Sequence, residues 1–435
     1  MKVMKLALLG TAALAAVSVS ARADNLSDLK SQIEALQADA AALQAAPSVP
    51  AGYSLLTMSE APAIVVPGLE VRDSNAKSAT VTTIGVLPTA DVPASTVIQW
   101  SGSVRAAIAY TDHDFDVGAP GGYVDYDELH LKARGRLDVT GTTDTAVGEV
   151  GASMSFYGDF DNNMTDDIGF TTNSASVYMD YAWGWWKMTP ELTFAGGYNG
   201  SLATIGYGIR KINDAYISRG SVGVDGGDFT QLRVSYNSGP VGVALALEHT
   251  DEGGNVASYS GGPFGVAAEV TYSGDMFNAE IAGFARDGDR DLGTAAGGKV
   301  TQTQIGLGLG AKLSDMFDVS VAGSIGNNVY FSDNLGWTYV GDGWEVSGAV
   351  VASLSDSISA ELGAGMSSYD ADWNGSINAA STDQVDRTAV AGGVYWSPVS
   401  QLKMGAQASW VEVDSSVALR DETELKAAFV TWWNF

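Results

Sequence analysis

The stretch DELHLKARGRLDV, Asp127 to Val139, repeats every two residues. One side of the repeat holds apolar or small residues, and the other holds His130, Lys132, Arg134, Arg136 and Asp138. Successive side chains of a β-strand point to opposite sides of the sheet. The stretch therefore predicts a strand that lies between an apolar and a polar surrounding. A strand that covers a protein core would alternate in the same way, so the rest of the chain decides what the apolar side contacts.

The same alternation continues to the end of the chain. In VIQWSGSVRAAIAY, residues 97–110, Arg105 falls on the polar side, opposite Val104 and Ile108. Further strands are expected near residues 146–157, 175–187, 191–198, 229–236, 241–250, 263–272, 277–286, 300–313, 317–326, 344–354, 358–368, 387–397, 402–412 and 424–435. The total is about 16, an even number, as in single-chain bacterial outer-membrane barrels.

The connections between these strands alternate in length. Short ones read as turns at 140–145, 237–240, 273–276, 314–316, 355–357 and 397–401. The others are longer and rich in Asp, Gly and Asn, such as residues 159–167 and 368–376. Short turns at one rim and long loops at the other are typical of transmembrane barrels. A soluble β-sandwich or propeller is the alternative.

The amino terminus predicts export. A basic MKVMK precedes the apolar run LALLGTAALAAVSV, and Ala21-Arg22-Ala23 fits a cleavage site, so residues 1–23 are expected to be a signal peptide. A retained anchor is the alternative, but the run is shorter than the ~20 residues that a spanning helix needs. No other stretch approaches that length without polar residues, which excludes a helical membrane protein.

Two further segments precede the strands. In residues 24–46, Leu26, Ile33 and Ala40 share one heptad position, while Leu29, Leu36 and Leu43 share the other. This pattern predicts a short periplasmic helix that forms a coiled coil, and an amphipathic helix packed on its own domain is the alternative. Residues 47–96 are interrupted by prolines and read as an extended linker with one strand near 79–87. The strand-rich barrel is expected over residues 97–435.

Composition excludes several classes of function. The chain has no Cys, so it offers no disulfide, thiolate nucleophile or thiolate metal site. Its formal charge is −28, and loss of the signal peptide would remove three basic residues and no acidic one, which makes nucleic acid an unsuitable partner. With 52 Gly, 17 Tyr and 11 Trp, the chain suits a large sheet with aromatic girdles.

The chain ends in FVTWWNF, Phe429 to Phe435, with Phe carrying the terminal carboxylate. With the signal peptide and the alternating strands from Val97 onward, this end resembles a Gram-negative outer-membrane general diffusion porin of the alphaproteobacterial kind. The resemblance implies a 16-stranded antiparallel transmembrane β-barrel in the cell outer membrane, assembled as a trimer. It also implies contact with outer-membrane lipid and lipopolysaccharide, and a terminal Phe that the barrel-assembly machinery reads before insertion.

In such porins the third long loop folds into the lumen and faces basic wall residues. The matching connection here is 199–228, which contains Arg210, Lys211 and Asp214. The expected pore-lining residues are Arg105, His130, Lys132, Arg134, Arg136, Glu149, Asp180, Arg210, Lys211 and Asp214. Inward acids on later strands suggest an opposite wall of the other sign: Glu248, Glu269, Glu280, Glu345 and Glu361. The alternative is that all these charges are simply a solvated lining.

No enzyme or cofactor motif is complete. Residues 293–300 nearly match a phosphate loop, but Val300 stands where Ser or Thr must reach magnesium. Residues 287–293 resemble the start of a calcium loop but lack its Gly and Glu. The sequence thus predicts a passive channel for small hydrophilic solutes and ions, without catalysis, cofactor or metal. A tether between outer membrane and cell wall, or a substrate-specific outer-membrane channel, is the alternative.

Overall fold

The computed structural model describes residues 56–68, 80–86, 96–115, 125–163, 176–213, 216–219, 226–249, 264–289, 299–332, 338–373, 382–416 and 421–435, all within the unit Leu56–Phe435. Its strands are β1 (Leu56–Pro62), β2 (Thr80–Val86), β3 (Thr96–Phe115), β4 (Tyr126–Thr145), β5 (Gly148–Asn163), β6 (Ser176–Lys187), β7 (Leu192–Gly200), β8 (Asp228–Ser238), β9 (Val241–His249), β10 (Phe264–Ser273), β11 (Phe277–Asp289), β12 (Lys299–Lys312), β13 (Phe317–Ser332), β14 (Thr338–Ser353), β15 (Ile358–Trp373), β16 (Thr382–Val399), β17 (Leu402–Ser415) and β18 (Glu422–Asn434). The same ranges hold one 3-10 helix, η2 (Gly208–Lys211), and no α-helix.

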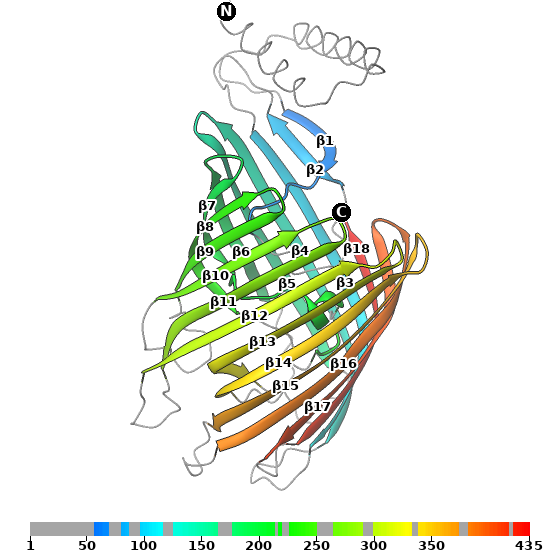
Figure 1. The fold of residues 1–435 in the computed structure, drawn as a ribbon. Coiled ribbons are helices and arrows are strands. Elements are labelled where there is room, and N and C mark those ends of the chain that lie inside the picture. Colours follow the sequence, from blue (N-terminus) through cyan, green and yellow to red (C-terminus); the bar gives the residue numbers. More distant parts are fainter. Residues whose placement is uncertain are drawn as a thin grey trace, which may run out of the picture. The chain divides into compact units, whose positions relative to one another are not determined.

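Strands β3 to β18 form a closed antiparallel barrel (Figure 1). Each strand pairs with the next in sequence, and β18 returns to β3 with Trp433 opposite Val104 and Glu422 opposite Phe115. Closure leaves no open sheet edge among these strands, as the hydrocarbon core of a bilayer requires. The 16-stranded antiparallel barrel expected from the sequence is therefore confirmed.

Two additional strands complete the sheet beside the seam. The last strand pairs with β3 only from Ser103 onward, which leaves the first residues of β3 without this partner. There β2 pairs along the free edge, with Thr82 opposite Trp100 and Val86 opposite Thr96. Strand β1 then pairs antiparallel with β2. Strand β2 matches the strand expected near 79–87, whereas β1 was not expected from the sequence.

The two sides of the barrel wall differ as the alternation predicts. On β18, Phe429 and Trp433 are about half exposed, whereas Val430 and Trp432 are buried. The exposed positions form the outer face and the buried positions form the inner face. Exposing an outer face of apolar side chains to water would cost free energy, whereas contact with lipid would not.

The rim with the short turns carries a second membrane signature. Exposed aromatic side chains gather on the strand ends beside these turns: Trp186, Phe194, Tyr236, Tyr272, Phe277, Phe317, Trp396, Trp433 and Phe435. Such a girdle marks the level where hydrocarbon meets headgroups. Several of the turns share one chemistry. The Ser314 hydroxyl, for example, accepts hydrogen bonds from the backbone N–H groups of Met316 and Phe317.

One expected turn is wrong. Residues 140–145 lie inside β4, which pairs with β5 as far as Thr145 opposite Gly148. This stretch is rich in Thr, whose branched Cβ suits a strand, so the chain turns only at 146–147.

The expected signal peptide and the coiled-coil helix at 24–46 lie outside the described residues. No helix in the described part of the chain has the length and apolar composition to cross a bilayer.

Candidate functional site

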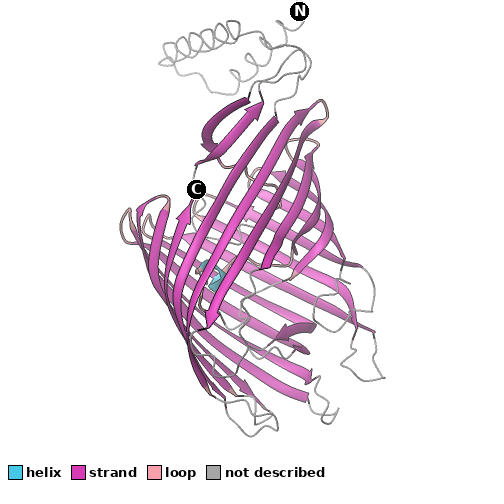
Figure 2. Cartoon of the chain, turned by 180° about the vertical axis from the view of Figure 1, so that it is seen from behind, coloured by secondary structure: helices cyan, strands magenta, loops and turns pink. Residues whose placement is uncertain are grey.

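A long loop between β7 and β8 contacts the inner face of the barrel. This constriction loop, residues 201–227, connects β7 to β8, and its described parts are 201–213, 216–219 and 226–227. Figure 2 shows its helix η2 inside the barrel. The loop contacts β13, β14 and β15 through η2, although it is anchored at β7 and β8. The expected inward-folding loop is thus present, and it follows the wall to the far side.

Small polar wall side chains hold the backbone of this loop. Ser320 and Ser347 accept hydrogen bonds from the N–H groups of Gly208 (2.7 Å) and Ile209 (3.1 Å). Further along, Glu361 accepts from the Asn213 N–H at 2.6 Å. Near its end, Gln407 donates to the Asn213 carbonyl and Ser409 accepts from the Ser218 N–H. The loop thereby satisfies backbone groups that would otherwise be buried without partners.

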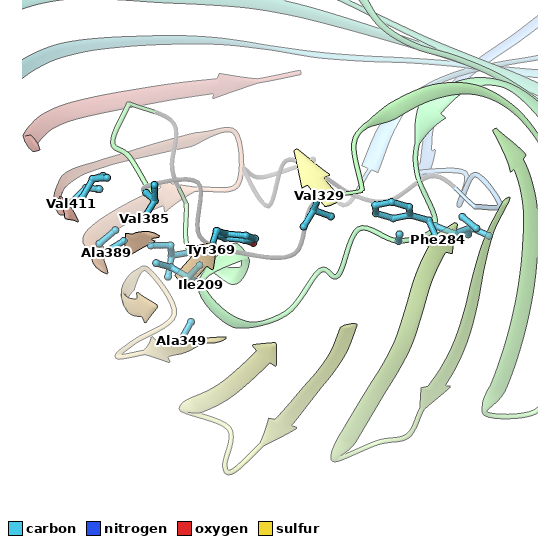
Figure 3. Packing of buried hydrophobic residues seen from close by; sticks show 14 of the residues in the cluster. Ile209, Phe284, Val329, Ala349, Tyr369, Val385, Ala389 and Val411 are labelled. Atoms are coloured by element: carbon cyan, nitrogen blue, oxygen red, sulfur yellow. The ribbon is translucent and has the colours of Figure 1, made fainter. Parts of the chain in front are cut away.

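Apolar packing fixes the same loop from beneath. The side chains of Ile205, Ile209 and Ile212 are at most 2% exposed, and each burial contributes on the order of 1.5–3 kcal/mol. Figure 3 shows Ile209 among wall residues, including Ala349 and Tyr369. Glycine in the wall lets the loop pack closely against it, because a Cβ at Gly308 would lie 2.7 Å from Ile205.

The part of the loop at residues 216–219 reaches the basic side of the pore. Tyr216 lies under the guanidinium of Arg105, 5.2 Å from ring centre to Cζ. Its hydroxyl is a neutral group beside this cation, because burial raises the Tyr216 pKa above its usual value. Among the described residues Arg105 has no carboxylate partner, and it is only 8% exposed. Its positive charge is therefore poorly screened by water.

Two bases of the neighbouring strand β4 are paired with acids. Arg134 forms a bidentate pair with Asp159 and lies over the Tyr157 ring. Arg136 contacts Asp138 at 3.1 Å and Asp180 at 3.0 Å. Of the expected pore-lining residues, the structure therefore brings Arg136 and Asp180 into direct contact.

The remaining expected site residues have other neighbours. His130 contacts Glu128 at 2.8 Å, and Glu149 contacts Lys187 at 2.8 Å and accepts from the Trp185 indole. Lys132 lies on β4 between His130 and Arg134. Arg210 and Lys211 close η2, and the Lys211 ammonium lies 4.9 Å from the Tyr207 ring centre. Asp214 lies outside the described residues.

The inner face does not separate into one basic and one acidic wall. Glu248, Glu280 and Glu345 are buried on later strands, as the alternation predicts. However, buried bases that were not expected from the sequence stand on the same side of the barrel: Arg233 on β8, Arg286 on β11 and Arg387 on β16. Their positions could have been found, since Arg233 lies between the exposed Leu232 and Val234. Mixed charge around the wall weakens any transverse field.

No protein-family model matches the sequence, and no curated protein matches it. Solved structures do match the fold. The outer membrane channel DcaP of Acinetobacter baumannii superposes with a TM-score of 0.57 at 15% identity, over 78% of this chain and 97% of that chain. The chain has the fold of an outer-membrane porin.

Two further structures agree with the porin fold. Salmonella typhi OmpF, solved with daunomycin, superposes with a TM-score of 0.51 at 12% identity, over 78% of this chain and 98% of that chain. The anion-selective porin from Comamonas acidovorans gives 0.50 at 13% identity, over 78% and 100% of the two chains. At these identities the likeness concerns the fold alone. Which solutes this protein passes depends on its own lining residues.

Proposed function

We propose that this protein is a passive diffusion channel of the cell outer membrane for small hydrophilic solutes and ions. The observation that carries the proposal is a closed barrel with an apolar outer face and an inner face of charged and hydroxyl-bearing side chains. Such an interior holds water across a bilayer. Movement down a gradient needs no catalytic group, cofactor or metal, and we assign none.

The lining supports a weak cation preference. Most bases of β4 are offset by neighbouring acids, as Arg136 is by Asp138 and Asp180. The chain as a whole carries a formal charge of −28. Charges at a channel mouth act over about 8–10 Å at physiological salt, so an excess of acids concentrates cations there. Arg105 opposes this effect inside the lumen.

We further propose that the channel is a trimer. The porin resemblance suggests it, and the outer face offers a place for a second copy. A shallow apolar groove of about 400 Å³ crosses the closure seam, lined by Ala106, Ile108, Leu131, Ala133, Phe160 and Phe429. Small side chains flanked by large ones allow close packing between membrane segments. Lipid, lipopolysaccharide and the barrel-assembly machinery remain proposed partners.

Liposome swelling tests the proposed channel. Purified, heat-modifiable protein is reconstituted into liposomes that are diluted into isotonic solutions of sugars of increasing size. We expect fast swelling with the smallest sugar and progressively slower swelling with larger ones. Correctly folded protein that gives no more swelling than empty liposomes would contradict a diffusion channel. Swelling with one sugar but not with its isomers would instead indicate a substrate-specific channel.

A further inference from the structure

The residues that follow β1 leave the sheet and contact the inner face of the barrel. We call residues 63–68 the inner strap. At its start, the Gln99 side chain accepts a hydrogen bond from the Ile64 N–H at 2.6 Å and donates to the Pro62 carbonyl at 2.8 Å. Gln99 is buried at 6% exposure near the short-turn end of β3. The strap is therefore held at the rim where the short turns lie.

The far end of the strap is held by three other inner-face side chains. The Trp183 indole donates to the Pro67 carbonyl at 2.9 Å. The Gly68 carbonyl accepts from Asn199 at 2.8 Å and from Arg233 at 2.6 Å. All three donors are at most 5% exposed. Buried donors need hydrogen-bond partners, and the backbone carbonyls of the strap supply acceptors to these three wall side chains.

Some side chains of the strap pack against the barrel wall, and one is exposed. Ile64 and Val66 pack against a buried cluster of Tyr181, Trp183, Trp185 and Ala195. Val65 between them is 84% exposed. The strap sequence AIVVPG carries no charge, so it offers the pore a neutral surface and not an ionic one.

Arg233 joins the strap to the constriction loop. Besides Gly68, its guanidinium donates to the Gly200 carbonyl at 2.9 Å, and Gly200 is the last residue before that loop. Gly68 has a φ of +68° and a Cβ there would lie 3.0 Å from the Arg233 side chain. Only glycine adopts this backbone without strain so close to the guanidinium. The junction is thus specific in both charge and shape.

We propose that the inner strap is a second narrowing of the pore, on the short-turn side of the constriction loop, which limits solutes by cross-section and not by charge. This proposal rests on the proposed channel function. Short turns face the periplasm in outer-membrane barrels. A solute entering from outside would therefore pass the charged constriction first and the neutral strap second.

A single cysteine tests the strap. The chain has no native Cys, so Val65→Cys gives one thiol, and Val147→Cys is the matched control. Val147 is 64% exposed in the β4–β5 turn at the same rim. Each variant is recorded in a planar bilayer before and after labelling with bulky thiol reagents that are neutral, cationic or anionic, and labelling is verified by mass.

We expect all three labels on Val65→Cys to cause a similar loss of single-channel conductance, and labels on Val147→Cys to cause none. Complete labelling of Val65→Cys with unchanged conductance would overturn the second narrowing. A loss that occurs with one charge of label only would overturn selection by cross-section. A Val65→Cys protein that is folded but silent before labelling would instead overturn the channel function on which the strap depends.

Discussion

The Arg105 guanidinium lies 5.2 Å from the centre of the Tyr216 ring, so a loop that connects β7 to β8 reaches β3, the strand that pairs with β18 where the barrel closes. Arg105 is a buried cation with no carboxylate partner among the described residues. It should therefore repel cations more strongly than its paired neighbours do.

Removing this charge should raise the cation preference. We expect Arg105→Ala to shift the zero-current potential in a KCl gradient toward the potassium equilibrium value. Lys312→Ala is the matched control, because Lys312 lies at the end of β12 at the short-turn rim, where its side chain is half exposed and paired with Asp315. Equal potentials for Arg105→Ala and the unmodified protein would show that ions do not pass near this side chain.

Reversing the paired bases of β4 should act in the same direction. Arg134→Glu with Arg136→Glu breaks the pairs with Asp159 and Asp180 and leaves like charges together. We expect a larger shift toward cation preference than Arg105→Ala produces, measured by the same potential. An unchanged potential would mean that these arginines do not face the ion path.

A larger side chain at Gly308 should displace the constriction loop from the barrel wall. A Cβ there would lie 2.4 Å from Tyr207, and such overpacking typically costs about 1–3 kcal/mol. We expect Gly308→Val to push the loop toward the pore centre, which lowers single-channel conductance and raises current noise. Gly348→Val is the control, since the nearest atom to its added Cβ is at 3.6 Å. Equal conductance in the two variants would contradict the close packing of the constriction loop against Gly308.

Assembly should depend on the terminal residue. The backbone N–H and carbonyl of Phe435 both bond to Gly102 at 3.0 Å, so deletion of Phe435 removes the last link of the closing strand. We expect that deletion, and Trp433→Asp on the outer face, to reduce the heat-modifiable protein in outer-membrane fractions. Trp433→Phe should insert normally. Normal accumulation of the Phe435 deletion would refute this role.

The heptad seam that the sequence predicts at residues 24–46 should add to the stability of the proposed trimer. We expect Leu29→Asp with Leu36→Asp to weaken the trimer without abolishing the barrel, because the charges fall on the apolar seam. Ser31→Asp with Ala38→Asp adds the same charge away from the seam and should leave the trimer intact. Native mass measurement in mild detergent compares them. A monomer in the unmodified protein would contradict the trimer itself.

Much of the barrel follows from local sequence pattern. The opposite exposure of Val104 and Arg105 is written in the two-residue repeat, since each side chain responds to its own surrounding. The inner strap could not be predicted in this way. Its bonds to Trp183 and Arg233 join residues 116 and 165 positions apart, and no local repeat records such contacts. The pairing of Arg136 with Asp180 depends likewise on neighbouring strands.

Single-channel recording of the unmodified protein in a salt gradient tests the central claim most directly. The proposed channel is a water-filled barrel that is lined by opposed charges and narrowed by the constriction loop and the inner strap. We therefore expect stable, ohmic conductance steps with a zero-current potential that is small and of the sign for cation preference. Folded protein that inserts into the bilayer without any conductance steps would contradict a diffusion channel.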